Sequence, residues 1–156
     1  MSGTVALPRS YRPFGARLAT GIAASVMVAA VAFLWLMLPA TVRAEFGVFQ
    51  RVTLLAFFLA VLAALNAMFR TSARADEGGL TVTNGYTVRR FAWPEVVRVS
   101  LGPHRPWALL DLADGTAVSV MAIQSSDGAR ATRATRELAA VIVQRSRPTP
   151  PPTGSS

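Results

Sequence analysis

The sequence LATGIAASVMVAAVAFLWLML occupies residues 18–38, and VTLLAFFLAVLAALNAMF follows at residues 52–69. The first run has 21 residues and the second has 18, and neither contains Asp, Glu, Lys, Arg or His. As helices they would be roughly 31 and 27 Å long, close to the ~30 Å hydrocarbon core of a bilayer. A soluble protein does not need helices that are apolar on every face. The two runs therefore predict a transmembrane helical hairpin.

The two spans divide the chain into segments of different composition. Pro39 ends the first span, and the connection that follows is short, so the spans are expected to run antiparallel as neighbours. The predicted organisation is a basic N-terminal tail at 1–17, a first span at 18–38, a connection at 39–51, a second span at 52–69, a linker at 70–79, a folded domain at 80–144 and a disordered Pro-rich tail at 145–156.

Arginines near the ends of the spans indicate the orientation. The N-terminal tail contains three, the segment after the second span contains Arg70, Arg74, Arg89 and Arg90, and the connection contains Arg43 and Arg51. Because loops on the cytoplasmic side carry the excess of basic residues, we expect a multi-pass protein of the plasma membrane with both termini in the cytoplasm. An alternative is a signal peptide cleaved after Ala44, although the first run is longer than a typical signal-peptide core and a second span follows at once.

Composition excludes several classes of function. The net charge is +8, and residues 1–75 hold seven arginines against one acid. Membrane topology and attraction to anionic lipid explain this excess of basic residues near the spans, so nucleic-acid binding is not expected. With no cysteine and only His104, neither a metal site nor thiol catalysis is expected. No glycine-rich phosphate loop or nucleophile elbow occurs, so we expect no enzyme, cofactor or small-molecule substrate. Glu95, Asp111 and Glu137 are the carboxylates to which the sequence assigns no role.

Beyond the linker the hydrophobic period changes to two. Leu80–Thr83 alternates and reaches Asn84-Gly85, a strong hairpin signal, and Asp114-Gly115 marks a second hairpin. The alternation slips at Arg89-Arg90, which predicts a bulge there. About five strands are expected, followed by a helix that ends near Gln144. One face of that helix is apolar: Ala131, Ala134, Leu138, Val141 and Ile142.

Small residues recur every four positions in both spans. They are Gly21, Ser25 and Ala29 in the first span and Ala56, Ala60 and Ala64 in the second. Such rows let two helices approach closely in lipid, so we expect them to form the contact within the hairpin. The alternative is that alanine is simply abundant in this chain.

A basic set with interleaved aromatic residues lies in the predicted domain. It comprises Arg89, Arg90, Arg98, Arg105 and Trp107. One interpretation is a site for lipid headgroups or for an acidic partner. The other is a charged face that keeps a small membrane-tethered domain soluble near an anionic leaflet.

From Trp93 onward the chain resembles the bacterial pleckstrin-homology (PH)-like domain of the actinobacterial low-molecular-weight protein antigen six family. The residues that carry the resemblance are Trp93-Pro94-Glu95-Val96, Arg105-Pro106-Trp107-Ala108, Asp114-Gly115, Val120-Met121-Ala122-Ile123-Gln124 and Asp127-Gly128. With the two spans included, the resemblance covers roughly residues 15–143. It implies strands closed by a C-terminal helix and no established enzymatic activity, although a complete PH domain has seven strands.

The expected fold class is α+β: a two-helix transmembrane hairpin followed by a small PH-like antiparallel β domain with a C-terminal capping helix. The expected function is a non-enzymatic, membrane-anchored binding module for a protein or peptide partner at the cytoplasmic face. Alternatives are an anionic lipid-headgroup sensor and an accessory subunit of an envelope or transport complex. The sequence leaves the oligomeric state open, and it also leaves open whether a full seven-stranded barrel forms.

Overall fold

The computed structural model describes residues 6–145, and the chain divides into two compact units. One unit is helical and runs from Phe14 to Arg70. The other is built from both flanking segments, up to Pro13 and from Thr71 onward. The predicted tail at 145–156 lies, beyond Arg145, outside the described residues.

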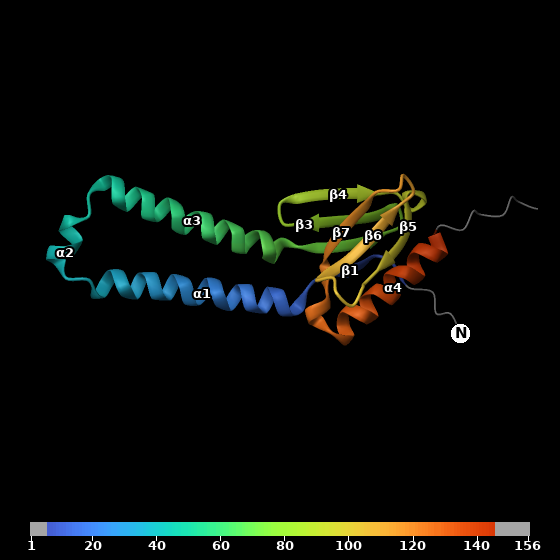
Figure 1. Ribbon diagram of the computed structural model, residues 1–156, viewed down its shortest axis with the longest axis horizontal. Helices are drawn as coiled ribbons and strands as arrows, with labels where there is room; N and C mark the ends of the chain where they lie inside the picture. The colour runs from blue at the N-terminus through green and yellow to red at the C-terminus, as the bar shows by residue number, and fades with distance from the viewer. Residues whose placement is uncertain (1–5, 146–156) are drawn as a thin grey trace, which may run out of the picture. The chain divides into compact units, whose positions relative to one another are not determined.

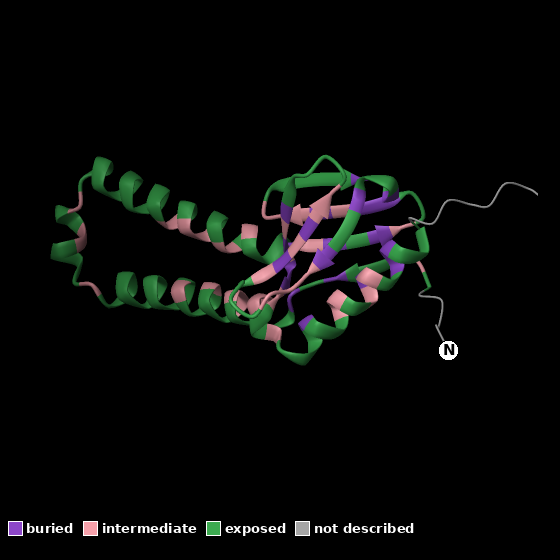
Figure 2. Cartoon of the chain, turned by 45° about the vertical axis from the view of Figure 1, so that its right-hand side comes forward, coloured by how far each residue is buried: buried purple, intermediate pink, exposed green. Residues whose placement is uncertain are grey.

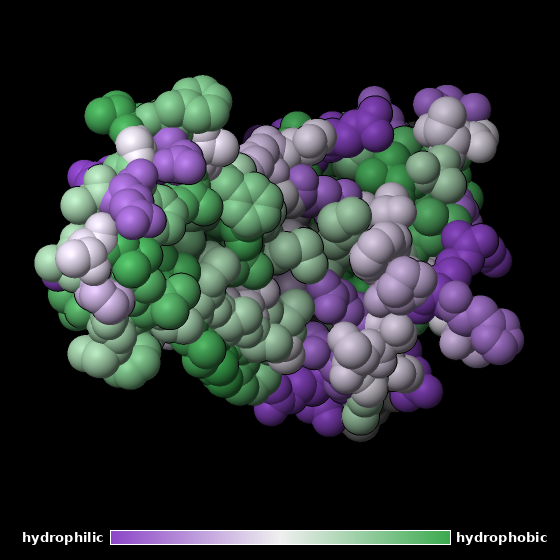
Figure 3. All heavy atoms as spheres, turned by 60° about the vertical axis from the view of Figure 1, so that its left-hand side comes forward, coloured by the Kyte–Doolittle hydropathy of each residue, from purple (hydrophilic) through white to green (hydrophobic). Residues whose placement is uncertain are grey.

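The helical unit contains two long helices joined by a short one (Figure 1): α1 (Phe14–Met37), α2 (Ala40–Glu45) and α3 (Val48–Arg70). Pro39 lies between α1 and α2, as expected of a residue that cannot continue a helix. Neither long helix buries a residue, and both are long and apolar enough to cross a membrane. In the views of Figures 2 and 3 these helices present an exposed and mostly hydrophobic surface.

The structure leaves most of the two predicted rows of small residues exposed, so their contact within the hairpin stays a prediction. Gly21 is partly covered, but a Cβ added there would meet nothing within 4 Å. Ser25 Oγ donates a hydrogen bond to the Gly21 carbonyl of its own helix at 2.9 Å. The exposed members are Ser25, Ala29, Ala56, Ala60 and Ala64. Larger side chains, among them Met27, Phe58 and Val61, instead line a cavity of about 710 Å³ between α1 and α3.

The second unit is a pair of antiparallel sheets and a helix. The first sheet has the order β1-β2-β3-β4 and the second has the order β5-β6-β7. The strands are β1 (Arg9–Tyr11), β2 (Ser72–Asp76), β3 (Gly79–Asn84), β4 (Thr87–Phe91), β5 (Val96–Ser100), β6 (Trp107–Leu112) and β7 (Ala117–Gln124). Two short 3₁₀ turns, η1 (Trp93–Glu95) and η2 (Ser125–Asp127), precede β5 and the helix α4 (Ala129–Arg145).

Strands β1 and β2 correct the predicted segmentation. The predicted tail 1–17 contains β1 and the first turn of α1, and the predicted linker 70–79 contains β2. The two strands pair directly, with Tyr11 opposite Ala73 and Arg9 opposite Ala75. Residues 6–145 therefore form seven strands rather than five, and the helical unit is inserted between the first and second strands of the β domain.

The core lies between the two sheets and beneath α4 (Figure 2). Its fully buried side chains come from every layer and include Leu80, Leu110, Val120, Ile123 and Leu138. The predicted apolar face of α4 is confirmed, since Ala131, Leu138, Val141 and Ile142 are buried and Ala134 packs against the core.

Strand β1 contributes one large side chain to this core. Tyr11 is only 6 % exposed, and its hydroxyl has no hydrogen-bond partner among the described residues. Burial, reinforced by the charge of Glu137, raises the pKa of Tyr11 to about 12. Arg9, two residues earlier, forms an ion pair with Glu137 of α4 at 3.0 Å. These two side chains connect the N-terminal segment to the rest of the domain.

The two hairpins are confirmed, but the bulge lies elsewhere. Strands β3 and β4 pair without irregularity through Arg89 and Arg90. The register instead shifts between Val96 and Arg98, one strand later. As a result Val96 and Val99 are buried, whereas Val97 faces solvent.

The interrupted domain should fold without the helices if both flanks are kept. In the test chain, a four-residue Gly-rich linker replaces residues 14–70. We expect this chain to fold and to show a cooperative unfolding transition, because β1 and β2 are adjacent antiparallel strands that a short linker can join. The fragment 80–144 should not, because it loses two strands and Tyr11. Removing a buried aromatic side chain costs about 3–5 kcal/mol, close to the whole stability of a small domain. Thermal denaturation followed by circular dichroism would test this, and equal melting temperatures would contradict it.

Candidate binding surfaces of the β domain

The edge strand β4 holds two of the predicted site residues, Arg89 and Arg90. Within residues 6–145, β4 pairs only with β3, and its first four residues are exposed. Both arginines line a hollow of about 670 Å³ where β4 approaches the β6–β7 turn. The other lining residues are Phe91, Glu95, Leu112, Ala113, Asp114 and Thr116.

The hollow holds both signs of charge. Asp114 Oδ1 accepts hydrogen bonds from the backbone nitrogen of Thr116 at 2.8 Å and from its hydroxyl at 2.7 Å. These hydrogen bonds lower the pKa of Asp114, and the positive charge of Arg89 adds a smaller effect in the same direction. Asp114 is therefore anionic at neutral pH. Two arginines and two carboxylates around one hollow suit a ligand that also carries both charges, such as a polypeptide, better than a polyanion.

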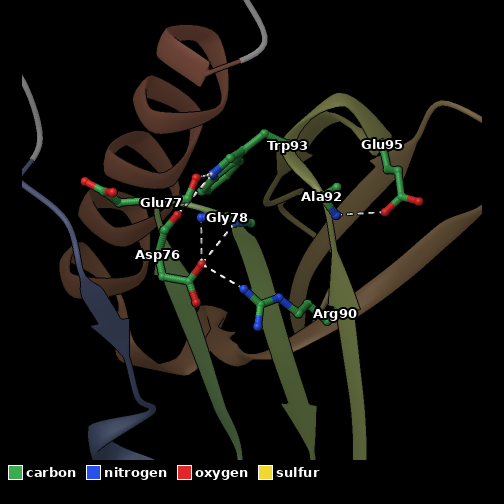
Figure 4. A network of polar contacts seen from close by, with 8 residues as sticks. Asp76, Glu77, Gly78, Arg90, Ala92, Trp93 and Glu95 are labelled. Atoms are coloured by element: carbon green, nitrogen blue, oxygen red, sulfur yellow. Dashed lines mark hydrogen bonds and ion pairs between the residues drawn. The ribbon is translucent and has the colours of Figure 1, made fainter.

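A network of polar contacts holds the end of β4 beside this hollow (Figure 4). Asp76 Oδ1 accepts hydrogen bonds from the backbone nitrogens of Gly78 and Gly79 at 3.0 and 3.1 Å, and it pairs with Arg90 Nη2 at 3.3 Å. The indole nitrogen of Trp93 donates to the carbonyl oxygens of Asp76 and Glu77 at 3.0 and 3.2 Å. Asp76 is thus a structural residue of the β2–β3 turn rather than part of a solvated linker.

The remaining predicted site residues lie away from the hollow. Arg98 on β5 forms an ion pair with Asp111 on β6 at 3.3 Å. Arg105 lies in the β5–β6 loop, where a Cβ at Gly102 would contact its side chain, and Trp107 begins β6 as a half-buried residue. The structure therefore distributes the five predicted residues over two sheets and a loop and brings only Arg89 and Arg90 together.

The three carboxylates without a predicted role all make structural contacts. Glu95 Oε2 accepts a hydrogen bond from the backbone nitrogen of Ala92 at 2.8 Å and so caps η1. Asp111 and Glu137 form the ion pairs with Arg98 and Arg9. Among residues 6–145, no group of three or more His, Cys, Asp or Glu side chains could hold a metal ion.

Sequence reasoning missed two features of this surface. Asn84 is more than a turn residue, because its amide nitrogen donates to the Ser119 carbonyl at 2.6 Å and its amide oxygen accepts from Met121 N at 3.1 Å. It thereby joins β3 to β7 across the two sheets. Val88, 61 % exposed, places an apolar side chain on the edge strand. The available sequence signal was the polar run around it, Thr87 before and Arg89-Arg90 after.

The turn beside the hollow has one position that accepts only glycine. A Cβ at Gly79 would collide with the carbonyl oxygen of Phe91, whereas a Cβ at Gly78 would meet only the far end of the long Arg90 side chain, at 3.0 Å. We expect Gly79→Ala to destabilise the full chain in detergent by about 2 kcal/mol or more and Gly78→Ala by less than about 0.5 kcal/mol. Thermal denaturation would measure both, and equal effects would show that the backbone is not closely packed at Gly79.

Comparison with known proteins shows what the β domain is similar to. Residues 70–140 match the bacterial PH domain family, a range that begins after β1. Uncharacterized proteins of Mycobacterium tuberculosis and Mycobacterium bovis are 41 % identical over 75 residues, which is 47 % of this chain and 49 % of theirs. The chain thus spans about half the length of the curated relatives that it matches. No solved structure matches it.

These comparisons support the broader part of the predicted resemblance. The bacterial PH domain match and the mycobacterial relatives agree with it, while the narrower antigen six family stays a prediction. Two sheets of four and three strands, followed by α4, agree with a PH-like arrangement. The chain carries two long apolar helices and a PH-like domain, a fold that suggests a binding module.

Proposed function

We propose that this protein is a non-enzymatic, membrane-anchored binding module. Its PH-like domain would bind an extended segment of a protein partner at the cytoplasmic face of the plasma membrane. The observation that carries this proposal is the exposed edge strand β4 beside a hollow with charges of both signs. An edge strand presents unpaired backbone groups, and an added peptide strand can pair with them while its side chains enter an adjacent pocket.

The insertion of the helical unit supports membrane anchoring with both flanks on one side. Strand β1 precedes α1, β2 follows α3, and the two strands pair with each other. A chain that crosses a bilayer at α1 must therefore cross back at α3 for this pairing to form. The arginine distribution favours the cytoplasmic side for both flanks. Cleavage after Ala44 would separate β1 from its partner strand, which disfavours the signal-peptide alternative.

The contacts of the carboxylates support the absence of catalysis. Glu95, Asp111 and Glu137 were the acids available for general acid–base chemistry, and each contributes to a cap or an ion pair.

Single cysteines would test the topology, because the chain has none of its own. We expect Gly47→Cys to react with a membrane-impermeant thiol reagent in intact cells, because the α2–α3 connection would lie outside. Ala6→Cys and Ser126→Cys should react only after the membrane is permeabilised. Labelling of Ser126→Cys in intact cells would place the domain outside. Different behaviour of Ala6→Cys and Ser126→Cys would contradict the pairing of β1 with β2 in the membrane-bound protein.

Site-specific crosslinking would test the binding surface. A photo-crosslinking residue at Val88 on β4 should capture one dominant protein in cells, whereas the same residue at Thr132, exposed on α4, should not. Arg89→Glu should lower the yield from position 88 about tenfold, because it reverses a charge that lines the hollow. Arg89 is preferred to Arg90, since Arg90 also contacts the β2–β3 turn.

The control is Arg133→Glu, which makes the same charge change on an exposed position of α4. It should leave the crosslink from position 88 unchanged. Equal losses for Arg89→Glu and Arg133→Glu would indicate a dependence on net charge alone. Crosslinking from position 88 to lipid instead of protein would favour the alternative, a sensor of anionic headgroups.

A further inference from the structure

We propose that the outward face of β1, β2 and β3 is a second binding site, which takes the phosphate group of an anionic lipid headgroup. The residues that line this site and those that line the hollow at β4 do not overlap. The phosphate chemistry of the site is independent of the proposed function, and only the assignment to a lipid rests on the proposed membrane anchoring.

Strand alternation and register assemble the site. Tyr11, Ala73, Ala75, Leu80 and Val82 point into the core, so the residues between them point outward. Ser10 lies opposite Arg74, Arg74 lies opposite Thr81, and Ser72 lies opposite Thr83. With Arg12 these residues line a cavity of about 320 Å³, whose remaining walls are Pro8 and Arg9. No carboxylate lines it.

Apart from Arg9, which pairs with Glu137, the polar side chains that line this cavity have no partners within residues 6–145. Elsewhere in the domain, Arg90 and Arg98 are each paired with a carboxylate. Arg12 and Arg74, in contrast, are exposed and have no ion pair within residues 6–145. The hydroxyls of the serines and threonines that line the cavity likewise have no side-chain hydrogen bond to the described part of the chain.

A phosphate group fits this combination of donors. Guanidinium groups bind phosphate oxygens through paired, charge-assisted hydrogen bonds, and hydroxyls supply further donors without adding charge. Neighbouring strands are about 4.8 Å apart, so Arg12, directly after β1, and Arg74 on β2 can reach one group in the cavity that the hydroxyls also line. The hollow at β4, where carboxylates face arginines, lacks this uniform positive potential.

Chain connectivity favours a lipid as the source of the phosphate. Arg12 lies two residues before the start of α1, and Ser72 lies two residues after the end of α3. Two extended residues span at most about 7 Å. If α1 and α3 cross the bilayer, the chain itself keeps Arg12 and Ser72 within a few residues of the membrane, where anionic lipid attracts basic groups.

The test uses the full chain in a nonionic detergent and measures binding of short-chain phosphatidylglycerol, phosphatidic acid and phosphatidylcholine by native mass spectrometry. We expect both anionic lipids to bind at least about tenfold more tightly than zwitterionic phosphatidylcholine. Arg12→Gln/Arg74→Gln should weaken anionic-lipid binding about tenfold, because it removes both guanidinium groups. The matched control Arg133→Gln/Arg136→Gln removes the same charge from α4 and should bind as the parent does.

A second variant keeps the test independent of the charge change. Thr81→Val/Thr83→Val removes two hydroxyls, keeps the branched shape that strands favour and should weaken binding about threefold. Unchanged binding in both variants would overturn the proposal. Inorganic phosphate that binds as tightly as the lipids would overturn the lipid assignment and leave a site for free phosphate. The assay contains neither a bilayer nor a protein partner, so its failure is distinguishable from failure of the crosslink at β4.

Discussion

The antiparallel pairing of β1 with β2 joins the two ends of the helical unit. Strand β1 (Arg9–Tyr11) lies just before the first apolar helix, and β2 (Ser72–Asp76) lies just after the second. This pairing completes a four-stranded sheet, brings Tyr11 into the core and places Arg9 beside Glu137 of α4. It also creates the face on which Arg12 and Arg74 lie. The helical unit is therefore inserted between the first and second strands of the β domain.

The strength of each sequence signal explains what could be predicted. The two apolar runs are long, the hairpins carry glycine at the turn, and α4 has a continuous apolar face, so each was recognisable alone. Strand β1 has only three residues, which is too short for a period to show. Strand β2 buries alanines, Ala73 and Ala75, in place of the branched residues that mark strands. The pairing of these strands across the inserted helices is a tertiary feature that no local pattern encodes.

The candidate site was predictable only in part, for a related reason. Composition located basic residues in the domain, but a sequence does not show which of them already have partners. The structure pairs Arg90 and Arg98 with Asp76 and Asp111 and leaves Arg12 and Arg74 without such partners among the described residues. Arg12 belonged to the presumed tail and Arg74 to the presumed linker, so neither entered the predicted set. Unpaired charges on a folded surface carry more information about ligands than the count of charges does.

The inserted helices also change the entropy of folding. Closing a long flexible loop between β1 and β2 would oppose their pairing, and the cost grows slowly with loop length. A helical hairpin brings its two ends close together without that flexibility, so it raises the effective concentration of β1 near β2. This contribution matters because β1 is short and depends on one buried aromatic ring and one exposed ion pair, which is a weak interaction in water. Since Arg12 directly follows β1, the phosphate site that we propose exists only while this strand is paired, and its occupancy would in turn stabilise the pairing by mass action.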